Sequence, residues 1–209
     1  MSQKDVGNKI PIYKLKTTDE VMKYYDEWGI KNKYDQDMID WNYTGPKETV
    51  ATFIKYAQDK NIKILDAGCG TGLVGIELKK YNYLNIDGMD LSKKLLDLVP
   101  EGYYQNLDQV DLNKPIKVKN NLYDAIMCVG TFTFGHVKPH ALDEFIRISK
   151  NKALICFTIN EGIYEEYGFD KKIQELKKNK SWEVKEFFKS NYIASKDVNA
   201  WLCLAEVIK

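Results

Sequence analysis

The sequence contains very little arginine, and this scarcity disfavours a common class of binding protein. Only one of its 31 Lys and Arg residues is an arginine, Arg147, although bidentate arginine contacts are the usual way to read guanine or clamp phosphate. The formal net charge is +1, so no overall field recruits nucleic acid or an anionic membrane. The sequence therefore argues against a nucleic-acid partner.

The sequence also lacks closely spaced cysteines, a signal-peptide core and a long apolar run. Its cysteines lie far apart with no C-x-x-C pair, at Cys69, Cys128, Cys156 and Cys203. This spacing is typical of buried thiols in a reducing compartment, and we expect no metal site. Residues 1–16 have no apolar core of a signal peptide, and no stretch approaches the roughly 20 apolar residues of a membrane span. We expect a cytoplasmic protein without a membrane span.

The 209 residues, 44% of them hydrophobic, suit one compact domain. We expect residues 1–60 to form an N-terminal helical cap and residues 61–209 to form an α/β core. Between Thr18 and Lys60, apolar residues recur at helical spacing, which predicts two or three helices. Thr18 and Asp19 are the expected caps of the first helix, and Gly45-Pro46 precedes the third.

After Asn61, short apolar runs alternate with helical stretches. The expected strands span 62–66, 84–89, 122–129 and 152–159, with a weaker one at 103–107. The expected helices span 72–80, 92–99, 138–149 and 162–178, and the runs 181–189 and 198–208 suit an antiparallel hairpin. Nearly continuous apolar strands are expected in a parallel sheet covered on both faces. The pattern predicts a doubly wound, mostly parallel α/β sheet that ends in an antiparallel hairpin.

The most informative stretch is the glycine-rich run from Ile64 to Gly75. An apolar strand ends at Asp66 and continues into Gly68, Gly70 and Gly72, where the chain turns sharply and a ligand can approach the backbone. Gly70-x-Gly72-x-x-Gly75 formally matches a dinucleotide fingerprint. However, the carboxylate of Asp66 would repel a pyrophosphate, whereas it suits the ammonium and sulfonium of S-adenosylmethionine, held directly or through water.

The segment Asp66 to Gly72 resembles the first motif of class I S-adenosylmethionine-dependent methyltransferases. The resemblance implies a Rossmann-like, seven-stranded fold, S-adenosylmethionine as cofactor and S-adenosylhomocysteine as product. It also implies that Asp90 takes both ribose hydroxyls, because a carboxylate accepts two hydrogen bonds at once. The full set of implied cofactor-binding residues is Tyr34, Asp66, Gly68, Cys69, Gly70, Asp90, Leu91, Asp111, Leu112 and Val129. For the adenine amino group, Asp111 is favoured over Asp108, and both stay open.

Two further segments carry a more specific resemblance. The stretch Tyr123 to Val137 and the N-terminal pieces Tyr25-Asp26-x-Trp28 and Tyr34-Asp35-Gln36-Asp37 are similar to the Williams–Beuren-region methyltransferase-like family. The resemblance covers about residues 20–160, and the last 45 residues match only in pattern. One departure is Lys150-Asn151-Lys152, where these enzymes usually have Lys-Pro-Gly-Gly. The aromatic residues of the N-terminal pieces either cover the cofactor or merely pack the helices on the sheet.

His136 is the candidate catalytic residue, because it lies in the loop after the fourth strand, where class I enzymes often present the acceptor. An imidazole suits taking a proton from a hydroxyl or carbon acid, although a purely structural histidine stays open. Phe132 and Phe134 in the same stretch favour a small, partly apolar acceptor. A protein acceptor stays possible, and the sequence does not determine the oligomeric state.

Two other functions compete with a methyltransferase. Tyr192-Ile193-Ala194-Ser195-Lys196 reproduces the Tyr-x-x-Ser-Lys pattern of NAD(P)-dependent short-chain dehydrogenases. That fold needs the pair on a helix with further strands behind it, and only 13 residues follow Lys196. The other alternative is a non-catalytic S-adenosylmethionine-binding sensor or partner subunit, because fold and cofactor do not establish catalysis.

Overall fold

One mixed seven-stranded sheet organises the computed structural model, which describes residues 9–15, 17–29 and 33–209. The strand order is β3-β2-β1-β4-β5-β7-β6. The strands are β1 (Ile64–Ala67), β2 (Ile86–Asp90), β3 (Asn106–Gln109), β4 (Tyr123–Phe132), β5 (Ser149–Asn160), β6 (Trp182–Ile193) and β7 (Val198–Val207). The first five pair in parallel, and β7 runs antiparallel to both β5 and β6. The predicted fold class, with its C-terminal hairpin, is confirmed.

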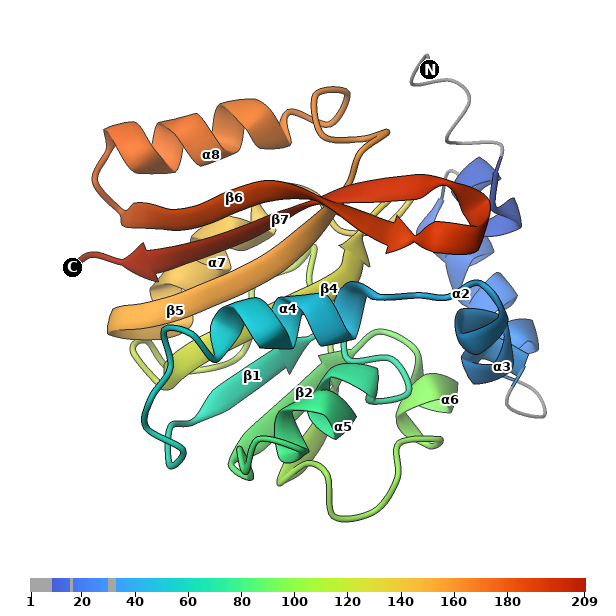
Figure 1. Ribbon diagram of the computed structural model, residues 1–209, viewed down its shortest axis with the longest axis horizontal. Coiled ribbons are helices and arrows are strands. Elements are labelled where there is room, and N and C mark those ends of the chain that lie inside the picture. The colour runs from blue at the N-terminus through green and yellow to red at the C-terminus, as the bar shows by residue number, and fades with distance from the viewer. Residues whose placement is uncertain (1–8, 16, 30–32) are drawn as a thin grey trace.

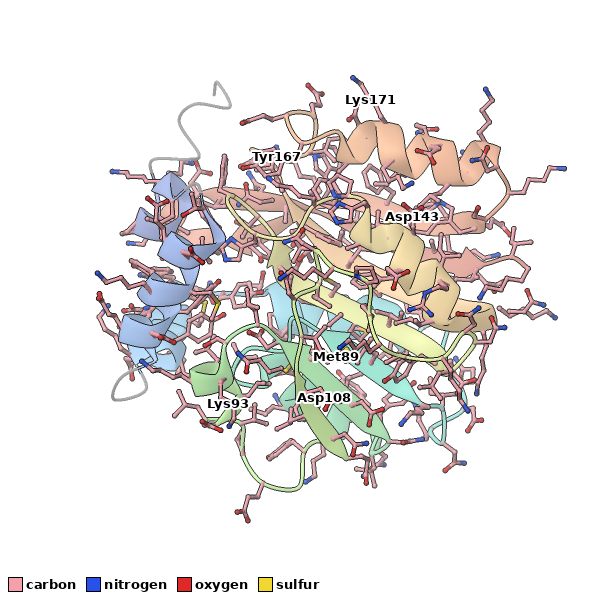
Figure 2. All side chains as sticks on the ribbon, turned by 180° about the vertical axis from the view of Figure 1, so that it is seen from behind. Met89, Lys93, Asp108, Asp143, Tyr167 and Lys171 are labelled. Carbon is pink, nitrogen blue, oxygen red and sulfur yellow. The ribbon has the colours of Figure 1, made fainter. Side chains whose placement is uncertain are left out.

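Helices cover both faces of this sheet and one of its ends. Figures 1 and 2 show α4 (Gly45–Phe53) and α5 (Leu73–Lys79) over one face, with α7 (Ala141–Ile148) and α8 (Phe169–Lys178) over the other. The helices α2 (Thr18–Trp28), α3 (Lys33–Asp40) and α6 (Lys93–Leu96) lie near the end toward which the arrows of β1 and β4 point (Figure 1). Two short 3-10 helices, η1 (Pro11–Lys14) and η3 (Ala194–Lys196), complete the described elements.

The core forms because the central strands are apolar on both faces. All four residues of β1 are buried, as the continuous apolar run predicts. On one face, Phe132 of β4 packs against Phe145 of α7 and Phe169 of α8, with ring centroids 6.2 and 4.8 Å away. On the other face, Phe53 of α4 packs against Tyr83 at 5.4 Å. Each fully buried aromatic side chain contributes roughly 2–3 kcal/mol to stability.

The N-terminal elements attach to the sheet end through a separate apolar cluster. Tyr13 and Trp28 belong to the same buried cluster as Ile193 and Val198 from the C-terminal hairpin. Helix α2 starts with a capping box in which Thr17, not the expected Thr18 or Asp19, accepts a hydrogen bond from the Glu20 backbone amide. Helix α4 lies within the predicted cap range 1–60 but packs on the sheet face.

Several predicted boundaries shift for identifiable reasons. The helix expected over 162–178 begins only at Phe169, because Gly168 adopts a left-handed φ of 79° just before it and residues 161–168 form turns. The helix after Gly45-Pro46 ends at Phe53, short of Lys60. The weak strand expected at 103–107 lies at Asn106–Gln109 on the edge of the sheet. All four of its residues are exposed, so an apolar pattern is absent there.

The four cysteines are free and buried, as their apolar surroundings predict. Among the described residues, no helix has the length and apolar character needed to cross a bilayer.

Candidate active site

The glycine turn after β1 places exposed backbone at the carboxyl ends of the parallel strands. Gly68, Gly70 and Gly72 adopt positive φ values of 83°, 53° and 91°, which side chains rarely tolerate. A Cβ on Gly68 would lie 2.1 Å from Oγ1 of Thr131, so this glycine allows the loop after β4 to approach closely. A Cβ on Gly70 would meet nothing within 4 Å. The turn is therefore closed on one side and open at Gly70.

A cavity of about 700 Å³ opens beside this turn, and it gathers most of the predicted site residues. It lies where ligands bind in open α/β sheets, at the carboxyl ends of the strands. Nine of the eleven predicted site residues line it: Tyr34, Gly68, Gly70, Asp90, Leu91, Asp111, Leu112, Val129 and His136. The two others, Asp66 and Cys69, do not.

Asp90 holds the glycine turn and still has room for a ligand. Its Oδ2 accepts a hydrogen bond from the Gly70 amide and its Oδ1 accepts one from the Ser92 amide, both at 2.8 Å. Burial raises the pKa of Asp90, while these backbone hydrogen bonds lower it. The Leu91 amide also favours the ionised form of Asp90, and of the roughly four acceptor positions of a carboxylate these amides leave room for a further donor. This arrangement suits a ligand hydroxyl group.

The structure separates the two candidate adenine-binding acids. Asp111 lines the cavity, and its Oδ1 accepts a hydrogen bond from the Asn113 amide at 3.0 Å. Asp108 is exposed on the edge strand β3, outside the cavity lining (Figure 2). The lining therefore favours Asp111 as the acid that faces a ligand.

Asp66 lies beneath the turn and contacts Tyr104. It is fully buried, and its Oδ2 accepts a hydrogen bond from the Tyr104 hydroxyl at 2.6 Å. The same hydroxyl accepts from the Gly75 amide at 3.0 Å, and Oδ1 of Asp66 has no partner. The pKa of Asp66 is raised to about 7, mainly by burial; the Tyr104 hydrogen bond opposes this rise and the nearby Asp90 carboxylate adds to it. Asp66 does not line the cavity, and its role in holding the cofactor, directly or through water, stays a prediction.

Cys69 helps to hold the glycine turn against the neighbouring strand. Its amide donates to the carbonyl oxygen of Met89 at 3.0 Å, which ties the turn to β2. Its side chain lines a smaller cavity of about 280 Å³ that shares Gly68, Gly70 and Val129 with the larger one. Burial raises the pKa of the Cys69 thiol, so the thiol stays protonated.

His136 faces the cavity as a neutral imidazole hydrogen-bonded at both nitrogens. Nδ1 lies 2.5 Å from the carbonyl oxygen of Phe134, and Nε2 lies 2.9 Å from the hydroxyl of Tyr25. A carbonyl oxygen only accepts, so Nδ1 carries the proton and the Tyr25 hydroxyl donates to Nε2. The pKa of His136 is lowered to about 4, mainly by burial; the Phe134 carbonyl opposes this shift and the nearby Lys138 adds to it.

A second set of contacts fixes the N-terminal helices over the cavity. Oγ1 of Thr71, in the glycine turn, donates to Oδ1 of Asp35 in α3 at 2.6 Å. A Cβ on Gly135 would lie 2.7 Å from the carbonyl oxygen of Leu15, so the loop after β4 touches the N-terminal segment. Tyr25 and Tyr34 form part of the cavity wall, which fits the covering alternative for these two residues. Trp28 and Trp41 do not line this cavity and pack in the N-terminal cluster, which fits the packing alternative.

Sequence reasoning missed Tyr104 and Thr71, and it misplaced Phe132. A Cβ on Gly75 would lie 2.5 Å from the Tyr104 ring, so the third glycine of the motif was an indirect signal of this neighbour. The Thr71 contact with α3 left no signal in the sequence. Phe132 was expected in a loop near the acceptor, but it is 1% exposed within the core. The apolar acceptor inferred from Phe132 therefore loses that support.

The dehydrogenase-like pattern does not form a dehydrogenase site. Tyr192 lies in strand β6, next to its last residue, whereas Ser195 and Lys196 lie in the short helix η3. Tyr192 contacts Tyr43 of the N-terminal region instead, with hydroxyl oxygens 3.3 Å apart. The helix that would align a tyrosine and a lysine is absent from this described segment.

Comparison with known proteins identifies the family. The family described as Methyltransferase domain matches residues 64–152, which contain the glycine turn and strands β1 to β4. Methyltransferase-like protein 27 of Homo sapiens is 31% identical over 141 residues, covering 66% of this chain and 56% of that protein. The chain carries a class I S-adenosylmethionine-dependent methyltransferase domain. The class resemblance of the motifs is thereby confirmed, and the chain spans little more than half the length of this curated relative.

Solved structures show the same fold for this methyltransferase domain. A methyltransferase in complex with the Trm112 methyltransferase activator of Haloferax volcanii aligns with a TM-score of 0.66 at 13% identity, covering 88% of this chain and 98% of that one. The magnesium protoporphyrin IX methyltransferase of Synechocystis PCC 6803, solved with bound SAM, aligns with a TM-score of 0.61 at 14% identity, covering 78% and 77%. At these identities, the likeness concerns the fold alone.

Proposed function

We propose that the domain transfers the methyl group of S-adenosylmethionine to a small, partly apolar acceptor. The observation that carries the proposal is that the open face of Gly70 and the carboxylates of Asp90 and Asp111 meet in one cavity at the carboxyl ends of the strands. When bound, S-adenosylmethionine supplies an electrophilic methyl group, which an acceptor takes by in-line displacement.

The residues present fit this cofactor. Gly70 would allow the ligand to approach the main chain, because no atom occupies the space in front of its Cα. Asp90 would hold the ribose through the acceptor positions that the backbone amides leave free. Asp111 would accept from the adenine amino group. The rings of Tyr25 and Tyr34 are suited to covering a cationic group and excluding water.

His136 would accept the proton that an acceptor hydroxyl releases. Its pKa of about 4 keeps the imidazole neutral at physiological pH, so Nε2 has a lone pair available. The Tyr25 hydroxyl already donates to that lone pair at 2.9 Å. A proton can therefore pass from the acceptor to the Tyr25 oxygen while the Tyr25 proton moves to Nε2 of His136.

The size and burial of the site favour a small acceptor over a protein. Tyr25 and Tyr34 cover the cavity from the N-terminal side, so an acceptor must fit beneath α2 and α3. A protein acceptor would have to insert a side chain through this cover, and it stays the second possibility. The four buried, free cysteines support a reducing, cytoplasmic location.

Calorimetric titration with S-adenosylmethionine and with S-adenosylhomocysteine tests the cofactor proposal. We expect micromolar binding that weakens about 30-fold or more in Asp90→Ala, because hydrogen bonding of the ribose to a charged group is lost. Asp143→Ala is the matched control, since Asp143 lies on α7 over the sheet face and pairs with Lys172 at 2.7 Å (Figure 2). No binding by folded wild-type protein would overturn the proposal.

Transfer of labelled methyl groups to fractionated small molecules then tests catalysis. Incorporation of label by the wild type that disappears in Asp90→Ala supports the proposal that the domain catalyses methyl transfer. Tight cofactor binding without transfer to any fraction, small molecule or protein, would instead favour a non-catalytic sensor or partner subunit.

A further inference from the structure

A second cavity, here called the aromatic chamber, adjoins the cofactor cavity. It has a volume of about 370 Å³ and shares Tyr25, Tyr34 and Gly130 with the cofactor cavity. Seven of its thirteen lining residues are aromatic, and none carries a charge. Its wall comes from the N-terminal elements, from Gly130 of β4 and Thr133 just after that strand, and from the end of β6.

We propose that the aromatic chamber is the acceptor subsite and that it takes an uncharged, planar ring bearing a hydroxyl group. This inference rests on the proposed methyltransferase function and names its substrate class.

The chamber favours a planar ring because its own rings are held in fixed orientations. The Trp28 ring lies edge-on to Tyr34 at 5.0 Å and 5.5 Å from Trp41. Outside contacts hold both indoles, since Nε1 of Trp28 donates to Asp37 at 2.6 Å and Nζ of Lys196 lies 5.2 Å from the Trp41 ring centroid. Preoriented aromatic faces and edges bind another aromatic ring more favourably than a bulky saturated one.

The chamber disfavours charged acceptors because, among the residues that the structure describes, no ionised side chain lines it. A carboxylate or phosphate placed there would lose its hydration without gaining an opposite charge. Aromatic faces attract cations, but an ammonium nitrogen has no lone pair with which to accept a methyl group. An uncharged ring therefore fits the uncharged wall of the chamber, and its hydroxyl oxygen has the lone pair that methyl transfer requires.

Polar groups in the wall of the chamber favour a ligand that carries a hydroxyl group. Thr133 is 4% exposed and lines the chamber. Its Oγ1 makes no hydrogen bond of good geometry, and the group near it is the Tyr13 hydroxyl, which belongs to the same chamber wall. A buried hydroxyl without a well-formed hydrogen bond is unfavourable, so a ligand that pairs with it gains affinity. The hydroxyls of Tyr43 and Tyr192 lie 3.3 Å apart nearby, and burial raises the pKa of both, so both remain neutral.

The wall between the two cavities is thin at Gly130. A Cβ on Gly130 would lie 2.8 Å from the Tyr43 hydroxyl, so only a glycine fits between this hydroxyl and the cofactor cavity. The Tyr25 ring lies on the same wall, with its hydroxyl on His136. A hydroxyl group bound against this wall faces both the cofactor cavity and the Tyr25 oxygen.

Tryptophan fluorescence of the full chain tests the chamber, because Trp28 and Trp41 line it. The probes are 2-naphthol, its carboxylate analogue 2-naphthoate and the saturated decahydro-2-naphthol, each titrated with and without S-adenosylhomocysteine. Thr133→Val removes the Thr133 hydroxyl and keeps the side-chain shape. Thr49→Val is the matched control, since Thr49 is also buried and its Oγ1 makes no hydrogen bond of good geometry, but it lines neither cavity.

We expect 2-naphthol to quench the fluorescence at concentrations at least about tenfold below those of 2-naphthoate and decahydro-2-naphthol. Thr133→Val should weaken 2-naphthol binding by about fivefold, with unchanged affinity for S-adenosylhomocysteine, and Thr49→Val should match the wild type. Equal binding of the three probes, no quenching by 2-naphthol, or an unaffected Thr133→Val would each overturn the inference. Failure of S-adenosylhomocysteine binding alone would instead count against the proposed function.

Discussion

The hydroxyl of Tyr25 donates to Nε2 of His136 at 2.9 Å, joining α2 to the loop after β4 across 111 residues of sequence. The partner of Nδ1 is a backbone carbonyl, which only accepts, so the proton of the imidazole lies on Nδ1. The two contacts together fix the orientation of the ring. The pair lies on the wall of the cofactor cavity, and Tyr25 also lines the aromatic chamber.

His136→Ala should lower turnover by about 10²-fold or more while cofactor affinity changes little, because general-base catalysis is lost and the ligand-holding acids stay intact. The measurement is methyl transfer at saturating cofactor together with calorimetric affinity. His140→Ala is the control, since Nε2 of His140 only contacts the carbonyl oxygen of Asn113 at 3.1 Å. Unchanged turnover would remove His136 from the mechanism.

The wild-type turnover should stay nearly flat from about pH 8 down to about pH 5.5, because His136 with a pKa near 4 remains neutral over this range. Protonation at lower pH fills the Nε2 lone pair, and turnover then falls. A pH–rate profile of kcat/KM checks this. An acidic limb centred near pH 6.5 that persists in His136→Ala would contradict the assignment.

Asp111→Ala should weaken S-adenosylmethionine binding by about fivefold or more, because one hydrogen bond to the adenine amino group is lost. Asp108→Ala should leave the affinity unchanged, since Asp108 is exposed on the edge strand. Parallel calorimetric titrations of the two variants compare the same substitution three positions apart. An equal loss in both, or a loss in Asp108→Ala alone, would show that the cavity lining misassigns the adenine contact.

The Gly70→Ala variant should fold, with a free energy of unfolding about 1 kcal/mol below that of the wild type. The φ of 53° at this position is strained for alanine, but the added Cβ meets no atom. The new methyl group should still lower S-adenosylmethionine affinity at least about tenfold, since it occupies the ligand's approach to the backbone. Gly168→Ala, with a φ of 79° and equally open surroundings before α8, is the strain-matched control. Equal cofactor affinities of the two variants would argue against a ligand at Gly70.

Asp66→Asn should change the pH dependence of stability. The folded-state pKa of Asp66, about 7, lies above its ordinary value, so its stabilising contribution is present at low pH and is lost as pH rises through 7. The free energy of unfolding of the variant relative to wild type should therefore rise by on the order of 3 kcal/mol between about pH 4 and pH 8.

Urea unfolding at several pH values measures this difference. Comparing variant with wild type isolates Asp66 from His136, whose lowered pKa acts in the opposite sense by removing stability as pH falls through 4. A difference that stays constant with pH would show that Asp66 is already ionised in the folded protein at low pH.

The order of the elements was predictable because it depends on local apolar patterns. The continuous apolar runs of β1, β4 and β5 predicted central strands, and the glycine-rich motif after β1 predicted the cofactor turn. The exposed edge strand β3 was poorly placed because only one neighbour and no covering layer shape its sequence. Helix α8 was predicted too long because the turn before Gly168 is rich in apolar residues such as Tyr164 and Tyr167.

The sequence by itself determined the fold class, the glycine turn and most of the acids that face the cofactor cavity, because these features follow from short segments whose geometry is local. Tertiary structure decided how Asp66 turns toward Tyr104, which group contacts His136 and where an uncharged chamber opens. Each of these depends on contacts between segments far apart in the chain, such as Tyr43 with Tyr192 across 149 residues. No local pattern encodes such a contact, since its energy arises only when the sheet has assembled and buried both partners.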